Sequence, residues 1–243
     1  MQIKNTICVV TGGTNGLGKA TVDKLLDLGT MVIIFDIKSP DITNQTRLDY
    51  IKTDITNEEN VIKSVEYVKN RYKRIDILLN CAGIGYTQEI IDHDTDKFIK
   101  IFQINCLGTF LCCKHIAKKM VENEDEERGV IINVASIAGV EGTSGQVAYS
   151  CSKGAILGMS MPLARDLSKY NIRVCTISPG PIDTGIKMAS YAEKLKKLSL
   201  VKRFGYPEEF AKLVIHMIEN QYFAGTPVRF DGGLVKPHMD SLL

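Results

Sequence analysis

The segment that decides the fold is Thr11-Gly12-Gly13-Thr14-Asn15-Gly16-Leu17-Gly18. It follows the β-branched run TICVVT at 6–11, which predicts a buried strand, and it opens a stretch at 17–28 with apolar residues at helical spacing. Any tight strand-to-helix turn favours glycine. At the first such turn of a strand–helix chain, glycines also let the backbone approach a pyrophosphate, which the helix N-terminus attracts through its N–H groups and dipole. The segment therefore predicts a dinucleotide site.

Strand and helix patterns alternate outward from this turn along the whole chain. The predicted strands are 6–11, 31–36, 48–53, 75–80, 130–135, 172–178 and 227–230, and the predicted helices are 17–28, 58–72, 94 to about 122, 146–170 and 207–220. This pattern predicts one α/β domain over 1–243, with a doubly wound parallel sheet of about seven strands and helices on both faces. Its ligand is expected beyond the carboxyl ends of the strands. Pro162, inside the helix predicted at 146–170, is expected to kink or break it.

Composition limits the classes of partner. The 243 residues are 44% hydrophobic and 24% charged, with a net charge of +2, which gives no reason to expect nucleic acid or a membrane as the partner. The longest apolar runs, such as 131–135, are too short to span a bilayer. The seven cysteines form no Cys-x-x-Cys pair, which predicts buried free thiols and no metal site. A strand beginning near Thr6 leaves no room for a cleavable signal, so we expect a cytoplasmic protein, or a mitochondrial one with an uncleaved signal.

The choice of cofactor depends on Asp36, the last residue of the second predicted strand, eighteen positions after Gly18. A carboxylate there can accept hydrogen bonds from both ribose hydroxyls of adenosine and repels a 2′-phosphate, which predicts NAD. Asn15 also favours NAD, because a basic residue at this place in the turn would instead favour the 2′-phosphate of NADP. Lys38 slightly favours NADP, because its ammonium could bind the 2′-phosphate. The alternative interpretation of Asp36 is an ordinary loop aspartate with no role in binding.

Tyr149 and Lys153 lie four residues apart and therefore on one helical face. The ammonium of Lys153 favours the phenolate, so that Tyr149 can exchange a proton near neutral pH despite its usual pKa near 10. The spacing alone means little, because about one such pair is expected by chance. Ser136 strengthens the catalytic interpretation of the Tyr149–Lys153 pair. It lies thirteen residues upstream of Tyr149 at the end of a predicted strand, and the Ser136 hydroxyl can hold a substrate oxygen beside Tyr149.

Asn105 interrupts an otherwise apolar helical stretch, where an amide is unfavourable both for the helix and for burial. Taken alone, it is best interpreted as a satisfied buried amide. Beside the other three residues, we expect it to hold a water that relays protons from Lys153.

Together these motifs resemble the short-chain dehydrogenase/reductase family over almost the whole chain. The matching residues are TGGTNGLG at 11–18, Asp54-Ile55, Asn80-Cys81-Ala82-Gly83, Asn105, Ser136, Tyr149 with Lys153, and Pro179-Gly180-Pro181-Ile182-Asp183-Thr184. The resemblance implies a Rossmann fold, a homotetramer, and Ser136, Tyr149, Lys153 and Asn105 as the catalytic residues. Ser136, Gln146 and Tyr149 are the expected contacts to a small-molecule substrate.

The family pattern also implies where NAD is bound. The expected contacts are Gly12, Asn15, Gly16, Leu17, Gly18, Asp36, Asp54, Ile55, Cys81, Ala82, Gly83, Tyr149, Lys153, Pro179, Gly180, Ile182 and Thr184. Asp54 and Ile55 are expected beside the adenine, and Thr184 at the nicotinamide carboxamide. Cys81 stands where many members have asparagine, and this departure should not affect the chemistry because the backbone faces the cofactor there.

Within the family, residues 129–142, 145–167 and 203–232 resemble the type-2 3-hydroxyacyl-CoA dehydrogenases, also known as 17β-hydroxysteroid dehydrogenase type 10. This resemblance implies an NAD-dependent 3-hydroxyacyl-CoA dehydrogenase. Separately, the polar, Lys-rich composition of 184–204 predicts a substrate lid there. The segment 85–98 is shorter than in that branch, so the substrate class is less secure than the chemistry. A 3-oxoacyl-acyl-carrier-protein reductase and a hydroxysteroid dehydrogenase are the alternatives. The intact catalytic set argues against a non-catalytic scaffold.

Overall fold

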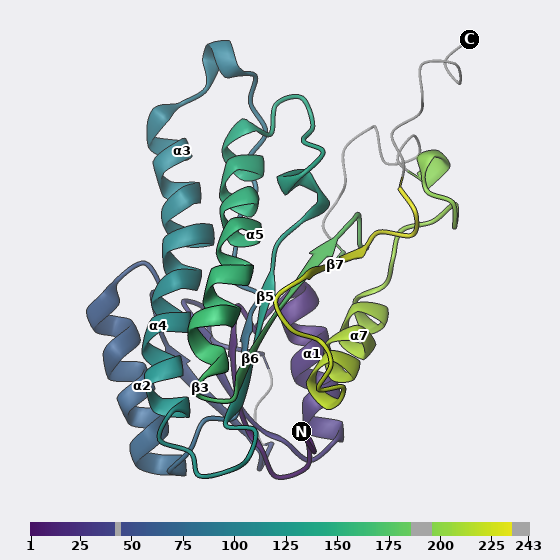
Figure 1. Ribbon diagram of the computed structural model, residues 1–243. Coiled ribbons are helices and arrows are strands. Elements are labelled where there is room, and N and C mark those ends of the chain that lie inside the picture. Colours follow the sequence, from purple (N-terminus) through teal and green to yellow (C-terminus); the bar gives the residue numbers. More distant parts are fainter. Residues whose placement is uncertain (42–44, 186–195, 235–243) are drawn as a thin grey trace.

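A computed structural model describes residues 1–41, 45–185 and 196–234, and these form a seven-stranded, all-parallel sheet in the order β3-β2-β1-β4-β5-β6-β7 (Figure 1). The strands are β1 (Ile7–Thr11), β2 (Met31–Asp36), β3 (Leu48–Lys52), β4 (Ile77–Asn80), β5 (Gly129–Val134), β6 (Ile172–Pro179) and β7 (Pro227–Phe230). The predicted doubly wound α/β fold is confirmed. The strand order reverses at β1, which pairs with both β2 and β4, so the ligand crevice of such a sheet is expected above these strands.

The helices connect successive strands. They are α1 (Gly16–Asp27), α2 (Glu58–Tyr72), α3 (Thr95–Phe102), α4 (Thr109–Met120), α5 (Val147–Ser168) and α7 (Pro207–Glu219), with short helical turns η1 (Ile90–Asp92), η2 (Gln103–Gly108) and η3 (Ile137–Gly139). Figure 1 shows α1 and α7 on one face of the sheet and α2, α4 and α5 on the other.

Both faces of the sheet are buried, which explains why the sequences of its central strands are apolar at successive positions. Cys8 and Val10 of β1 belong to the core cluster that includes residues of α1 and α7. The alternate residues Ile7 and Val9 belong to the second cluster, with side chains of α2 and α4. A parallel strand alternates its side chains between two helical layers, so each β1 residue finds an apolar partner.

Local signals set the helix ends. The side chain of Asn57 accepts a hydrogen bond from the Asn60 N–H at 3.0 Å and caps α2, whose first turn carries Glu58 and Glu59. The helix ends at Lys73, in the left-handed region at φ 69°. The predicted element ends lie within two residues of the observed ones, and for α2 these caps are the local signal.

The structure corrects three predictions. The helix expected from 94 to about 122 contains a π-helical turn, η2, between α3 and α4. The break expected as one alternative at Pro162 is absent, because α5 runs through it and packs along β6, where Ser160 bonds Thr176, and the other alternative, a kink, stays a prediction. Burial of the thiols is wrong for Cys151, which is exposed.

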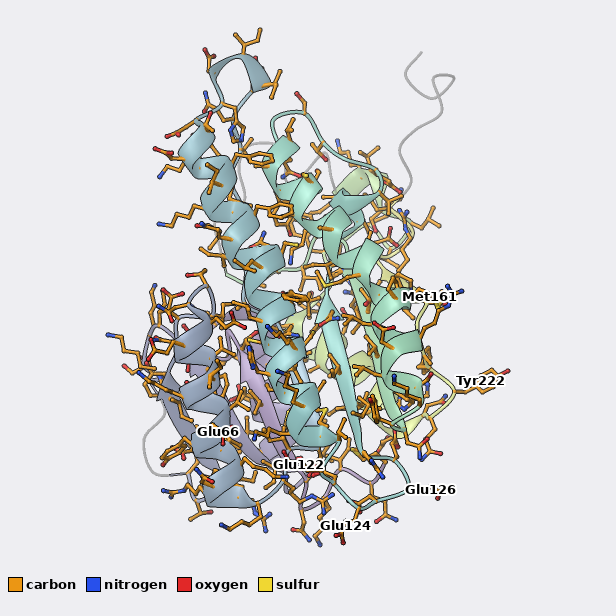
Figure 2. The ribbon with its side chains drawn as sticks, turned by 60° about the vertical axis from the view of Figure 1, so that its left-hand side comes forward. Glu66, Glu122, Glu124, Glu126, Met161 and Tyr222 are labelled. Carbon is orange, nitrogen blue, oxygen red and sulfur yellow. The ribbon has the colours of Figure 1, made fainter. Side chains whose placement is uncertain are left out.

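The expected lid at 184–204 lies partly outside the described residues, because 186–195 are not among them. The loop at 122–128 lies at the amino ends of the strands, where Glu124 and Glu126 point outward (Figure 2). Among the helices of the described ranges, none is long and apolar enough to cross a membrane.

Candidate active site

A cavity of about 1120 Å³ opens at the carboxyl ends of β1, β2, β3 and β4, at the point where the strand order reverses. Of the residues predicted to contact the cofactor, its lining contains Gly12, Asn15, Gly16, Leu17, Gly18, Asp36, Asp54, Ile55, Cys81, Ala82, Gly83 and Thr184. The cavity is thus large enough for a dinucleotide and lies where a doubly wound sheet binds one.

The glycine-rich turn fits closely against the end of β4. Gly12 has φ +67°, and a Cβ there would lie 2.7 Å from Ala82 Cα. A Cβ on Gly18 would lie 2.2 Å from the carbonyl oxygen of Gly12. Asn15, the N-cap residue of α1, makes no side-chain cap bond, which leaves the first N–H groups of the helix for a ligand. These features fit the pyrophosphate of a dinucleotide.

Asp36 ends β2 and faces the glycine-rich turn. Its Oδ2 accepts hydrogen bonds from Thr14 Oγ1 at 2.7 Å and from the Thr14 N–H at 3.3 Å, and its Oδ1 accepts one from the Lys38 N–H at 3.1 Å. The carboxylate is therefore fixed at the cavity wall. Sequence analysis missed Thr14, although its hydroxyl inside the glycine-rich turn was a usable signal.

Asp54 and Ile55 form the next part of the wall. Asp54 Oδ1 accepts bonds from the Thr56 N–H at 2.9 Å and from Thr56 Oγ1 at 2.7 Å. The buried side chain of Ile55 packs against Gly108, where a Cβ would lie 2.6 Å from Ile55 Cδ1. The lining also includes Ile99 and Lys100 of α3 and Gln103 of η2, which were not predicted from the sequence. A helix that follows β4 at the strand reversal was the available signal for them.

Tyr149 and Ser136 come from α5 and from the end of β5. Ser136 Oγ accepts a hydrogen bond from the Ala138 N–H at 3.1 Å and so caps the turn η3. Burial raises the pKa of the Tyr149 phenol, and its hydrogen bond with the Ser136 side chain lowers it, so the two predicted residues do interact.

Lys153 is buried, and its Nζ donates a hydrogen bond to the Val134 carbonyl oxygen at 2.8 Å. The Nζ lies 5.9 Å from the centroid of the Tyr149 ring. Burial lowers the pKa of Lys153 to about 8. The ammonium is thus still mostly protonated at neutral pH, close to the point at which it releases its proton.

Asn105 lies in the π-helical turn η2 and is fully buried, with 0% of its side chain exposed. Its Oδ1 accepts from the Ile84 N–H at 2.8 Å, and its Nδ2 donates to the Ile84 carbonyl at 2.9 Å and to Ser152 Oγ at 2.9 Å. Asn105 is therefore a satisfied buried amide, and its role in a proton relay stays a prediction. A π-turn inside an α-helix is frequent at functional sites.

Gly83 shows how closely these groups converge. A Cβ on Gly83 would lie 3.1 Å from Asn105 Oδ1 and 3.5 Å from Lys153 Nζ. Because Gly83 also lines the cavity, the buried polar groups reach its wall at this point. The arrangement places an ammonium at the wall of a dinucleotide-sized cavity, with the Tyr149 ring 5.9 Å from it, which is suitable for moving a proton while a hydride is transferred.

Seven predicted contacts are not among the residues that line the cavity, namely Ser136, Tyr149 and Lys153, described above, and Gln146, Pro179, Gly180 and Ile182. Gln146 precedes α5 and accepts the Ser150 N–H at 2.8 Å through its carbonyl oxygen. Pro179 ends β6, and a Cβ on Gly180 would lie 2.6 Å from Asp231 Cβ. Ile182 packs against the core and bridges to Gly205. Their contacts to substrate or cofactor remain predictions.

Comparison with known proteins places the chain among dehydrogenases. The family model for short chain dehydrogenase matches residues 6–195. A 3-hydroxyacyl-CoA dehydrogenase type-2 of Drosophila melanogaster is 37% identical over 252 residues, which cover 96% of this chain and 98% of the relative. An NAD-dependent glycerol dehydrogenase of Listeria innocua serovar 6a is 35% identical over 96% of this chain and 94% of its own length.

The fold agrees with these matches. The ligand-free aldohexose dehydrogenase of Thermoplasma acidophilum superposes with a TM-score of 0.87 and 25% identity, over 97% of this chain and 98% of that structure. The similarity therefore extends over the sheet and the site together.

Gly18→Ala should weaken dinucleotide binding, because the new Cβ meets the Gly12 carbonyl and must displace the turn. Fluorescence titration with NADH measures the Kd, which we expect to rise at least about tenfold, a loss of about 1.4 kcal/mol. Gly158→Ala on α5 is the matched control, since a Cβ there has nothing within 4 Å. An unchanged Kd in Gly18→Ala would show that the turn does not bind the dinucleotide.

Lys153 should make stability depend on pH. The folded pKa of about 8 is below the usual value of 10.5, so the unfolded chain binds more protons between these values. The unfolding free energy of the wild type, relative to Lys153→Met, should therefore rise between pH 8 and 10.5, by on the order of 3 kcal/mol. Urea unfolding at each pH measures it. Parallel stability curves for the two proteins would contradict a depressed Lys153 pKa.

Proposed function

Because the chain belongs to the short-chain dehydrogenase family, we propose that it is an NAD-dependent oxidoreductase that interconverts a secondary alcohol and a ketone. The observation that carries the proposal is that Lys153 Nζ approaches Gly83 at the wall of the dinucleotide-sized cavity, with the Tyr149 ring 5.9 Å from this Nζ and Ser136 in contact with Tyr149. Proton transfer and hydride transfer must occur at neighbouring atoms of the substrate, and this geometry supports both.

Each residue has a distinct role in this mechanism. Ser136 holds the substrate oxygen, and Tyr149 takes the hydroxyl proton during oxidation or returns it during reduction. The positive charge of Lys153 stabilises the phenolate that oxidation requires. NAD, when bound, supplies the ring that accepts the hydride from the alcohol carbon. Asn105 fixes the backbone of Ile84, next to Gly83, and we propose that it also helps to hold a proton-relay water.

Asp36 supports NAD over NADP. Its carboxylate lines the cavity at the end of β2 and is oriented by two hydrogen bonds from Thr14. A fixed carboxylate accepts ribose hydroxyls and repels a 2′-phosphate. Lys38 lines the same cavity and is the group that would favour the phosphate.

We propose a 3-hydroxyacyl-CoA as the substrate, on the basis of the similarity to the type-2 enzyme of Drosophila melanogaster. Lysine and arginine side chains in 184–204 could contact the phosphates of coenzyme A, but two of these basic residues already have partners within the chain. Arg203 is already paired with Glu209 at 2.7 Å, and Lys202 Nζ donates to the Lys197 carbonyl at 2.9 Å. The similarity to a glycerol dehydrogenase favours a small alcohol as the second candidate. An acyl-carrier-protein thioester with NADPH is opposed by Asp36, and a steroid remains an alternative.

We further propose a cytoplasmic homotetramer. Apolar side chains remain exposed on the outer sides of two neighbouring helices, with Phe110 of α4 exposed by 44% and Met161 of α5 by 39%. Figure 2 shows α4 and α5 side by side, with Met161 on the outer side of α5. Exposed apolar patches of this kind suit contact with further copies of the chain.

Asp36→Ser should lower kcat/KM for NADH by about 10–100-fold and raise it for NADPH, because hydrogen bonds to a charged group contribute about 1.5–3 kcal/mol. Thr14→Val should lower the NADH value by about tenfold by releasing the carboxylate, and Thr14→Ser, which keeps the hydroxyl, should match the wild type. Steady-state kinetics with both cofactors checks this. An unchanged NADH/NADPH ratio in Asp36→Ser would mean that the carboxylate does not select the cofactor.

The wild type should reduce acetoacetyl-CoA with NADH, and Tyr149→Phe should lose about 10²–10⁴-fold in kcat, the usual contribution of a general acid. Absorbance at the NADH band measures the rate. A panel of acetoacetyl-CoA, a ketosteroid and dihydroxyacetone decides the substrate class. Turnover of the steroid or dihydroxyacetone with no turnover of acyl-CoA would overturn the acyl-CoA proposal and leave the dehydrogenase chemistry in place.

A further inference from the structure

Ser152 occupies an unusual position between the catalytic tyrosine and lysine on α5. Its side chain is fully buried, with 0% exposed. Its Oγ donates a hydrogen bond to the Tyr149 carbonyl oxygen at 2.8 Å and accepts one from Asn105 Nδ2 at 2.9 Å. The hydroxyl therefore uses its donor within α5 and its acceptor on the neighbouring turn η2.

The Asn105 amide extends this link to a third element. Through its two bonds to the Ile84 backbone, it holds the segment that follows β4. That segment contains Gly83, where a Cβ would lie within 3.5 Å of Lys153 Nζ. Ser152 thus connects the first turns of α5 to the same segment that Lys153 approaches.

We propose that Ser152 is a positioning residue for the dehydrogenase reaction. By hydrogen bonding to Asn105, it fixes the start of α5 against η2, and so places the Tyr149 hydroxyl at Ser136 and Lys153 Nζ at the Val134 carbonyl. The inference rests on the proposed function for the reaction that is positioned. The alternative is that Ser152 only fills space in the core.

Removing the Ser152 hydroxyl should change the geometry of the site, because the proposed catalytic groups lie on two different elements. Ser136 and Val134 belong to the end of β5, which the sheet holds, whereas Tyr149 and Lys153 belong to α5. Ser152→Ala leaves a buried Asn105 N–H without its partner, and such a group is unfavourable until the amide or the helix moves. Either movement changes the distances between the two sets of catalytic groups.

Ser160 provides a matched control on the same helix. It is 1% exposed, and its Oγ donates to the Ile156 carbonyl at 2.9 Å and shares a hydrogen bond with Thr176 Oγ1 at 2.6 Å. It is eleven residues from Tyr149, about three helical turns. Ser160→Ala removes an equally buried and bonded hydroxyl, so we expect it to lower the Tm and leave the catalytic groups in place.

The first readout needs no substrate. NMR titration of protein labelled with ¹³C at tyrosine Cζ, with Tyr149→Phe for assignment, reports the pKa of the Tyr149 phenol. In Ser152→Ala this pKa should rise above the wild-type value, because the hydrogen bond with Ser136 that lowers it is weakened. Ser160→Ala should titrate as the wild type does. The Kd for NADH should not change in Ser160→Ala, since Ser160 neither lines the cavity nor bonds a residue that does.

The second readout is kinetic. Ser152→Ala should lose about tenfold in kcat, equal to about 1.4 kcal/mol. If Ser152 acts through Asn105, the double variant Asn105→Ala/Ser152→Ala should be no slower than Asn105→Ala. Additive losses, or equal tyrosine titration in Ser152→Ala and Ser160→Ala, would overturn the proposal. If the wild type reduces nothing in the substrate panel, the proposed function fails, and the tyrosine titration still decides the role of Ser152.

Discussion

The contact between Gly12 and Ala82 is the constraint on which the site depends. The two residues follow adjacent strands, β1 and β4, on either side of the point where the sheet reverses its order. With no Cβ on Gly12, the glycine-rich turn packs directly on the backbone at the end of β4. The two strand ends then form one continuous wall, with the helix N-terminus above it. The cavity, the position of Asp36 and the approach of Lys153 to Gly83 all follow from that wall.

Three of the groups proposed for catalysis are buried, and each of these three is fixed by a hydrogen bond to the backbone. Lys153 bonds the Val134 carbonyl, Asn105 bonds Ile84, and Ser136 caps η3. Buried polar groups stabilise a structure only when they are satisfied, and a satisfied network is rigid. Burial also lowers the pKa of Lys153 to about 8 and raises that of Tyr149, so the surrounding protein sets the protonation of both residues.

The π-helical turn η2 shows where local reasoning is insufficient. The apolar spacing from 94 to about 122 fits one α-helix, and nothing in it marks an extra residue per turn. The turn is stabilised by contacts that are distant in sequence, namely the bonds from Asn105 to Ile84 and Ser152 and the packing of Gly108 against Ile55. Likewise Pro162 would be expected to interrupt an isolated helix, and α5 continues because it packs along β6.

The sequence by itself determined the alternation of strands and helices, most of their ends, and the residues at the carboxyl ends of the strands. Hydrophobic period, caps and glycines are local, and local signals predict local structure. Only the tertiary structure decided that Thr14 orients Asp36, that Ser152 joins Asn105 to Tyr149, and that α3 lines the cavity. These contacts join residues up to 47 positions apart, and their geometry depends on how whole elements pack. The glycine-rich turn depends on both the sequence and the tertiary structure. Its glycines predict a tight bend, and the packing of this bend on the end of β4 forms one wall of the cavity.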